Sequence, residues 1–260
     1  MIKNNGFSLT EVLMAVGILS IGIMLVATMF PAAIYLTTVA SEKTMASIVA
    51  DEAFAKMQLF GFKLRKEDQL RTTGFYRYWE EMQDGDNINN DFDVDPNEYI
   101  YPSLDGDSGK PQYSWSALCK KLNDDPLDNR YLVKLYVTRK TSSNMIFFKN
   151  ALFNDANNSD WPVPVCVDVL YSPPNKLTMG SEASGYVNPP PSTVIIDNKS
   201  GRLFRIISSD KTSMTLDRNW DNDINTPKLV WVVPSGKVND KPAGKNPDID
   251  VFQKIIDFKK

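Results

Sequence analysis

The chain has 260 residues, with 29 basic and 32 acidic side chains and a formal net charge of −3. This length allows one large domain or two small ones, and the charge shows no basic excess of the kind that favours a nucleic-acid partner. The sequence contains no histidine, which excludes Ser-His-Asp and Cys-His catalysis and zinc binding by histidine.

The N-terminus combines a short polar leader with a long apolar segment. Residues 1–6 read Met-Ile-Lys-Asn-Asn-Gly, and from Val12 through Ser41 there is no Asp, Glu, Lys or Arg. A helix over residues 7–36 rises about 1.5 Å per residue, which is enough to cross a hydrocarbon core of roughly 30 Å. Glu11 lies at the start of this segment, where a carboxylate is costly unless it stays near the interface or finds a partner.

These residues resemble the prepilin signal shared by type IV pilins and the pseudopilins of type II secretion. Gly6 precedes Phe7, which is the first mature residue in that pattern, and Glu11 takes the fifth mature position. The resemblance implies that a prepilin peptidase cuts between Gly6 and Phe7 and methylates the new amino group. It also implies that Glu11 pairs with a Phe7 amine, its own or that of a neighbouring pilin or pseudopilin subunit, in a homo- or hetero-polymeric filament.

Two other interpretations of the N-terminus stay open. An ordinary secretory signal has a basic n-region, an apolar region of about 7–15 residues and a small-residue cleavage site, which here would lie near Ala32-Ala33. The leader has a single Lys, however, and the apolar run is longer than such a signal needs. A plain membrane anchor explains the run but not the Gly-Phe-x-x-x-Glu pattern.

Lys3 in the leader favours a cytoplasmic N-terminus. The resemblance then implies a protein of the bacterial inner membrane that crosses it once, keeps its C-terminal part outside the cytoplasm, and later joins a pilus or pseudopilus filament. Pro31 lies within the apolar run and removes one helix hydrogen bond, which predicts a kink or local melting.

The helix is predicted to continue over residues 37–61 as an amphipathic extension that ends near Gly61. Its apolar positions recur three and four residues apart, with the charged residues off that face. They are Ala46, Val49, Ala50, Ala53, Phe54, Met57 and Phe60. The predicted fold class is α+β: a long N-terminal helix, membrane-spanning in its first half, packed on an antiparallel β-rich globular domain over residues 62–260.

Within that domain, residues 84–107 form a strongly acidic loop. Calcium prefers six to eight oxygen ligands, so this loop is a weak calcium candidate. The carboxylates concerned are Asp84, Asp86, Asp91, Asp93 and Asp95. The segment fails the EF-hand pattern, since Ile88 takes a ligand position. A solvated acidic loop without a cofactor is therefore preferred, with calcium as the alternative.

Period-two patterns predict several strands after Tyr131. They cover residues 132–138, 163–171, a hairpin over 193–207, 213–216 and 228–233, with 250–258 as a strand or a short helix. Pro164 suggests that its strand lies at a sheet edge. Residues 145–148 are ambiguous, and residues 62–83 are predicted as a second short helix.

The two cysteines and three tryptophans each allow two interpretations. Cys119 and Cys166 form one disulfide if the domain lies outside the cytoplasm, or are buried separately as small apolar residues. Trp115, Trp161 and Trp220 contact a partner or a sugar, or else pack half-buried, which is the commoner role.

The predicted function is a structural subunit of a type IV pilus or of a type II secretion pseudopilus, with minor-subunit features. The expected partners are other such subunits, the prepilin peptidase and the inner membrane. A membrane-anchored binding protein or adhesin that does not polymerise is the alternative. An enzyme is not expected, because the sequence has no histidine, no Gly-rich phosphate loop and no recognisable nucleophile.

Overall fold

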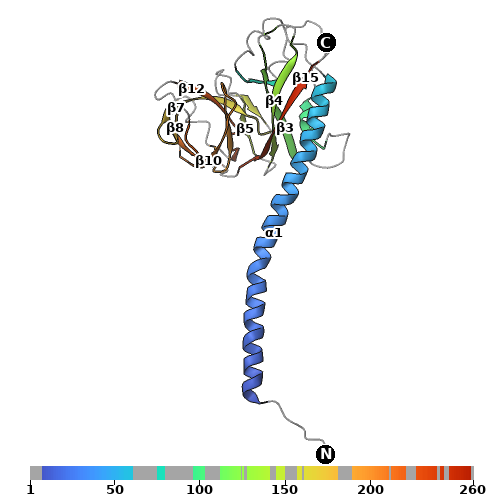
Figure 1. Ribbon diagram of the computed structural model, residues 1–260, viewed down its shortest axis with the longest axis vertical. Coiled ribbons are helices and arrows are strands. Elements are labelled where there is room, and N and C mark those ends of the chain that lie inside the picture. The colour runs from blue at the N-terminus through green and yellow to red at the C-terminus, as the bar shows by residue number, and fades with distance from the viewer. Residues whose placement is uncertain are drawn as a thin grey trace, which may run out of the picture. The chain divides into compact units, whose positions relative to one another are not determined.

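The computed structural model describes residues 8–60, 75–79, 96–102, 112–123, 125, 128–140, 145–149, 157–159, 161–180, 189–210, 212–220, 227–238, 241–242 and 246–258. Within these residues it has one long apolar α-helix near the N-terminus and a strand-rich part (Figure 1). The chain divides into two units, Met1–Met45 and Ala46–Lys260. The predicted α+β class is therefore confirmed at this level.

Helix α1 runs without a break over Leu9–Phe60, and Gly61 lies outside the described residues. Pro31 lies inside this helix, and the residues on both sides of it are helical. The chain therefore does not melt at Pro31, and the kink stays a prediction. Because proline has no N–H, the carbonyl of Ala27 lacks its usual helix donor at this point.

From Ala46 onward α1 buries one face in the core of the second unit. Six of the seven predicted apolar positions are buried, and the side chain of Phe60 lies outside the described residues. The six are Ala46, Val49, Ala50, Ala53, Phe54 and Met57. On the flank of this face Lys56 forms ion pairs with Glu52 and Glu98, each at 2.8 Å. In this half of the helix, the apolar residues that recur every three or four positions in the sequence are thus the residues that are buried.

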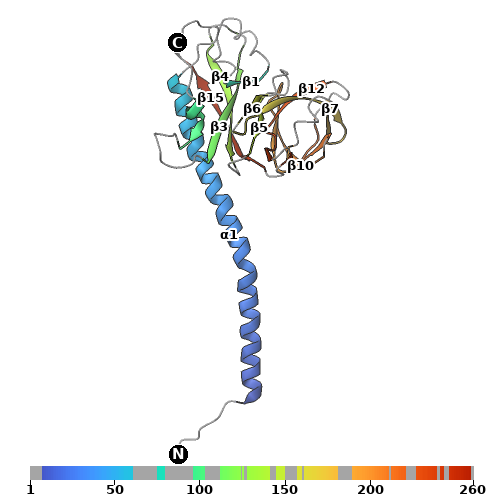
Figure 2. The same ribbon diagram turned by 180° about the vertical axis from the view of Figure 1, so that it is seen from behind.

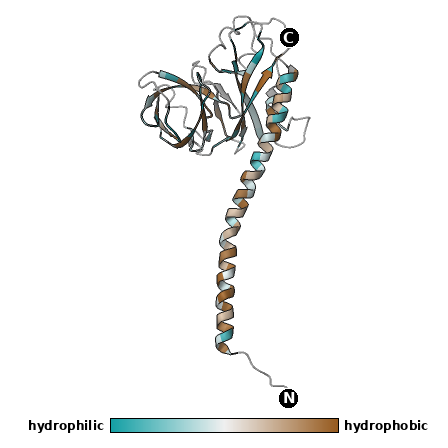
Figure 3. Cartoon of the chain, viewed as in Figure 1, coloured by the Kyte–Doolittle hydropathy of each residue, from teal (hydrophilic) through white to brown (hydrophobic). Residues whose placement is uncertain are grey.

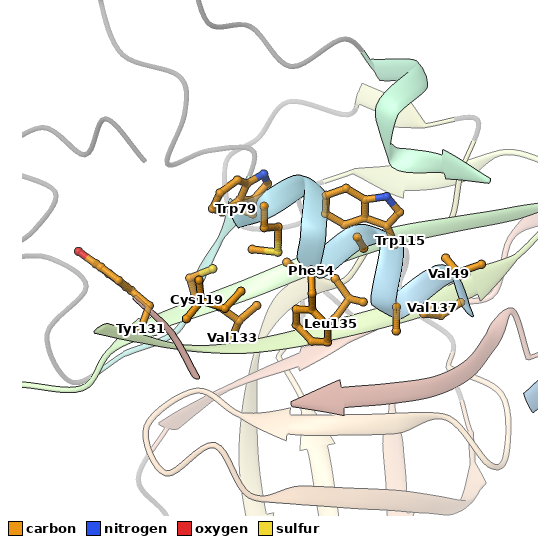
Figure 4. Close-up of a cluster of buried hydrophobic side chains, with 14 of the residues drawn as sticks. Val49, Phe54, Trp79, Trp115, Cys119, Tyr131, Val133, Leu135 and Val137 are labelled. Carbon is orange, nitrogen blue, oxygen red and sulfur yellow. The ribbon is translucent and has the colours of Figure 1, made fainter. Parts of the chain in front are cut away.

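The buried face of α1 packs on an antiparallel sheet of five strands (Figure 4). The sheet has the order β1-β3-β4-β15, and β2 also pairs with β3. The strands are β1 (Arg77–Tyr78), β2 (Ile100–Tyr101), β3 (Tyr113–Lys121), β4 (Arg130–Arg139) and β15 (Asp248–Asp257). Trp115 of β3 and Leu135 and Val137 of β4 belong to the same buried cluster as the helix face.

Some predictions for this sheet were right and others were wrong. The strand at 132–138 is confirmed within β4, and the tail at 250–258 is strand rather than helix. The helix predicted over 62–83 is wrong at Arg77–Tyr78, which form β1; most of that range lies outside the described residues. Strand β3 was not predicted, because serines alternate with its apolar residues and resemble a loop.

The second sheet is a closed barrel with the strand order β10-β11-β8-β7-β12-β9 (Figure 2). Its strands are β7 (Val165–Ser172), β8 (Lys176–Met179), β9 (Val194–Asp197), β10 (Leu203–Ser209), β11 (Ser213–Leu216) and β12 (Pro227–Val232). Inward side chains from all six strands, among them Val167, Leu177 and Ile195, fill its interior. The predicted hairpin and the strands at 213–216 and 228–233 are confirmed.

The prediction of an edge strand at Pro164 is wrong. Strand β7 pairs with β8 on one side and β12 on the other, so it has no free edge in the barrel. Pro164 comes directly before Val165, the first residue of the strand, where its missing N–H removes no ladder hydrogen bond.

Five short elements complete the described structure. Strand β5 (Phe147–Lys149) pairs with β6 (Asn157–Ser159), and β13 (Lys237–Val238) pairs with β14 (Lys241–Pro242). A 3-10 helix, η1, covers Pro96–Tyr99. The ambiguous segment at 145–148 thus includes the start of β5.

In chain order the barrel is an insertion into the first sheet. Strands β4 and β15 pair along their whole length, from Thr138 with Asp248 to Arg130 with Asp257, yet every barrel strand lies between them in the sequence. The Arg139 N–H donates to the Pro247 carbonyl at 2.8 Å, so the two ends of the inserted segment lie side by side. The helix-and-sheet core is therefore complete without the barrel strands.

The barrel meets the sheet through a third buried cluster, here called the junction. It contains Tyr76, Leu118, Tyr136, Cys166, Trp231 and neighbouring apolar residues. Asn198 lies at its centre: its Oδ1 atom accepts hydrogen bonds from the Tyr76 N–H and from Trp231 Nε1, both at 2.9 Å. Because one buried amide joins the residue before β1 to a residue of barrel strand β12, it helps to fix the position of the sheet relative to the barrel.

Gly201 permits a close approach of Tyr76 at this junction. Its φ is +72°, and a Cβ added there would meet Tyr76 ring carbons at 2.7 and 2.8 Å. We expect Gly201→Ala to lower the free energy of unfolding by about 2 kcal/mol or more, because it combines a strained backbone with overpacking. Urea unfolding followed by tryptophan fluorescence measures this.

Gly180→Ala is the matched control, since its added Cβ would meet Asp168 atoms at 3.6 and 3.7 Å, which is ordinary contact. We expect a change within about 1 kcal/mol there. Equal losses at the two glycines would contradict the close approach at Gly201.

Candidate functional site

The first half of α1 is apolar on all sides and uncovered (Figure 3). The relative exposure of its large apolar side chains runs from 49% at Val12 to 79% at Leu9. By length and composition the helix can cross a membrane, and none of its most apolar 18-residue stretch is buried. Burial of apolar surface contributes roughly 25 cal/mol per Å², so this half requires a lipid or protein environment.

The serine and threonine hydroxyl groups of this segment are satisfied by the helix itself. Between Val12 and Leu36 the only serine and threonine are Ser20 and Thr28. Ser20 Oγ donates to the Val16 carbonyl at 2.7 Å, and Thr28 Oγ1 donates to the Leu25 carbonyl at 2.8 Å. In lipid a polar group without a partner is costly, so these internal bonds suit a membrane segment.

The helix begins with a capping box formed by Ser8 and Glu11. Ser8 Oγ accepts a hydrogen bond from the Thr10 N–H at 3.2 Å, and Glu11 Oε2 accepts one from the Ser8 N–H at 3.1 Å. Each side chain thus satisfies a backbone donor that the helix start leaves open. The carboxylate also lies at the positive end of the helix dipole, which favours its charge.

Glu11 therefore has a local partner, which the sequence interpretation missed. The signal was present, since Ser-x-x-Glu at residues 8–11 is the capping-box pattern. Among the described residues, Oε1 of the same carboxylate accepts no hydrogen bond. Gly6 and Phe7 lie outside the described residues, so the predicted cleavage site and its amine stay predictions.

The calcium candidates lie outside the part of the chain that the structure describes. They are Asp84, Asp86, Asp91, Asp93 and Asp95. The described residues contain no group of three or more His, Cys, Asp or Glu side chains that could hold a metal ion. Calcium binding by the acidic loop therefore stays a prediction that the structure does not test.

The two cysteines are free and buried. Cys119 lies in the cluster between helix and sheet, whereas Cys166 lies in the junction. Complete burial raises the pKa of the Cys119 thiol well above its ordinary value. Since the thiolate is the reactive form, Cys119 is chemically inert, and the structure corresponds to separate burial rather than to a disulfide.

The tryptophans mostly pack within the fold. Trp115 is 5% exposed and donates from Nε1 to the Glu98 carbonyl at 3.0 Å. Trp220 is 4% exposed and stacks on Phe204 with 4.5 Å between ring centroids. Trp161 is half-buried, with the Lys140 ammonium 5.4 Å from its ring centroid. Packing thus accounts for Trp115 and Trp220.

Comparisons of the chain with protein-family profiles, with curated proteins and with solved structures found no match. The class of protein is therefore indicated by the residues of the chain itself. A single uncovered apolar helix near the N-terminus, followed by a strand-rich unit, is consistent with a membrane-anchored protein.

The exposed first half of α1 is predicted to be the part of the chain that binds the membrane. We expect the double variant Leu19→Asp with Ile23→Asp to leave the membrane fraction, because each mid-span carboxylate costs about 2.5–3.5 kcal/mol on insertion. Resistance of the chain to carbonate extraction measures this. The paired variant Ile48→Asp with Leu59→Asp changes two exposed positions later in the same helix, and we expect it to stay membrane-bound. Extraction of neither variant, or of both alike, would contradict the assignment.

Proposed function

We propose that this chain is a structural subunit of a type IV pilus or of a type II secretion pseudopilus. Prepilin peptidase processes it, and it assembles through its N-terminal helix. The observation that carries the proposal is the Gly6-Phe7-x-x-x-Glu11 pattern, which ends in the first turn of a helix that is apolar on all sides from Val12 to Leu36.

The two halves of α1 support an assembly role. The segment from Val12 to Leu36 is exposed along its whole length, whereas the part from Ala46 onward is buried on one face. In the membrane the first half contacts lipid. In a filament neighbouring copies of this helix replace the lipid, an exchange driven by close packing rather than by leaving water. The strand-rich unit then lies outside the helical bundle.

The capping box supports the proposed role of Glu11. The Ser8 N–H holds Oε2 at the helix start, and Oε1 accepts no hydrogen bond from the described residues. A positively charged Phe7 amine can therefore pair with Oε1 without breaking the cap. The ammonium would neutralise a carboxylate in an apolar bundle, where an unpaired charge is strongly unfavourable.

The inserted barrel favours a second candidate function. A module inserted between two strands that pair with each other adds no residue to the buried cluster under α1, which suggests that the barrel serves recognition. The alternative is therefore a membrane-anchored extracytoplasmic binding protein or adhesin that does not polymerise. It differs from the first proposal at the N-terminus, because it requires neither cleavage nor Glu11.

The first test concerns processing. In a host with an active prepilin peptidase, we expect the membrane-extracted protein to begin at an N-methylated Phe7. Intact-mass measurement with N-terminal sequencing checks this, and Gly6→Leu serves as the uncleaved control. A wild-type chain that still begins at Met1, or one that begins near Ala33, would rule out the subunit proposal.

The second test separates the charge of Glu11 from its capping role. Glutamine also serves in a capping box, so Glu11→Gln keeps the acceptor for the Ser8 N–H and removes only the charge. We expect this variant to be cleaved and membrane-bound but to lose most filament assembly, measured by shearing and electron microscopy or by secretion that depends on the filament. Glu42→Gln, in the same helix, is the matched control. Normal filaments with Glu11→Gln would show that its charge has no role in assembly.

A further inference from the structure

The strand-rich unit contains buried polar atoms that have no hydrogen-bond partner in the described structure. Among the described residues they include Ser116 Oγ, Tyr136 Oη and Asp248 Oδ1. Ser116 and Tyr136 lie opposite each other on β3 and β4, and Asp248 begins β15. Unpaired polar atoms are rare in buried interfaces, so such a group indicates a function or a stored cost.

Asp248 links the two parts of the strand-rich unit. Its Oδ2 atom accepts a hydrogen bond from the N–H of Val194, the first residue of barrel strand β9, at 3.2 Å. Its own N–H donates to Asn246 Oδ1 at 3.0 Å, and the same oxygen accepts from Thr193 Oγ1 at 3.2 Å. The carboxyl group thus ties the start of β15 to the start of β9 with a single N–H donor.

A neutral carboxyl group suits this position better than a carboxylate. Asp248 is only 9% exposed, and its Oδ1 atom accepts no hydrogen bond from the described residues. An ionised group in such a place costs several kcal/mol unless other donors or a cation compensate. The neutral form avoids most of this cost and still accepts the Val194 hydrogen bond.

The charged and titratable groups around Asp248 only partly offset its burial. Burial is the main cause that raises the pKa of Asp248 to about 7, and the negative charge of Asp250 on β15 adds to it. The Val194 N–H and the Arg205 guanidinium on β10 act in the opposite direction. Tyr136 on β4 stays neutral, since burial raises its pKa well above the ordinary value, with smaller contributions from Asp248 and Cys166.

We propose that the contact between β9 and β15 is a proton-controlled latch, closed while the Asp248 carboxyl group is neutral and loosened when it ionises. The proton goes to solvent as the contact opens, and the carboxylate becomes hydrated. The proposal uses only the strand-rich unit and does not rest on the assembly function. Outside the cytoplasm such a latch would respond to the pH of the surroundings.

The direction of the pH effect follows from linkage. In the opened state Asp248 returns towards the ordinary pKa of 3.8, whereas in the closed state its pKa is about 7. Between these values the opened state binds fewer protons, so opening becomes more favourable as pH rises. The opening constant should rise by up to about tenfold per pH unit between about pH 4 and 7 and level off above about pH 7.

Hydrogen exchange of the full chain in detergent micelles tests the latch. After correction for intrinsic exchange rates, we expect protection of the Val194 amide to fall at least about tenfold between about pH 5 and 7. Amides in the β3–β4 ladder, such as that of Leu135, should keep their protection over this range. The same protection at Val194 throughout would overturn the proposal without any variant.

Two variants assign the effect to one carboxyl group. Asp248→Asn keeps the shape and the acceptor for Val194 but cannot ionise, so we expect the pH dependence at Val194 to vanish. Asp250→Asn removes the neighbouring carboxylate of the same strand and should retain it. Loss of the pH dependence in Asp250→Asn, or its survival in Asp248→Asn, would place the titrating group elsewhere and overturn the latch.

Discussion

The change in burial along α1 at Ala46 is the constraint on which the rest of the structure depends. From Val12 to Leu36 the helix is apolar on every side and exposed, and from Ala46 onward one face packs against a sheet. A continuous helix cannot leave the first half in water, because the exposed apolar surface is far larger than single scattered side chains account for. The apolar surface of the first half therefore has to be covered by lipid or by protein.

The helix was the part that the sequence predicted best, and the reason is physical. The apolar positions from Ala46 to Met57 recur with the period of a helix. Because a single sheet covers this side of the helix, the same positions are the buried ones. The hairpin around Gly201 was predicted for a similar reason, since its turn and its alternating strands are local in sequence. Both features depend on neighbours within a few residues.

Features that depend on distant residues were missed. Ser114 and Ser116 made β3 resemble a loop, although both side chains are buried and Ser114 Oγ is hydrogen-bonded to Thr138 Oγ1 on β4. Barrel closure leaves β7 without an edge, although Pro164 suggested one. The partner of Glu11 is local, in contrast, since the four-residue Ser-x-x-Glu pattern at residues 8–11 predicts the capping box. Burial of Asp248 could not be predicted, since its donor is on another sheet.

The hydrogen bond between Arg139 and Pro247 brings the two ends of a segment of about one hundred residues next to each other. A segment with adjoining ends can be exchanged for another of different size while the flanking strands keep their register. The buried cluster under α1 contains no residue of a barrel strand, so a change inside the barrel leaves that cluster intact. A change at the junction affects both the sheet and the barrel.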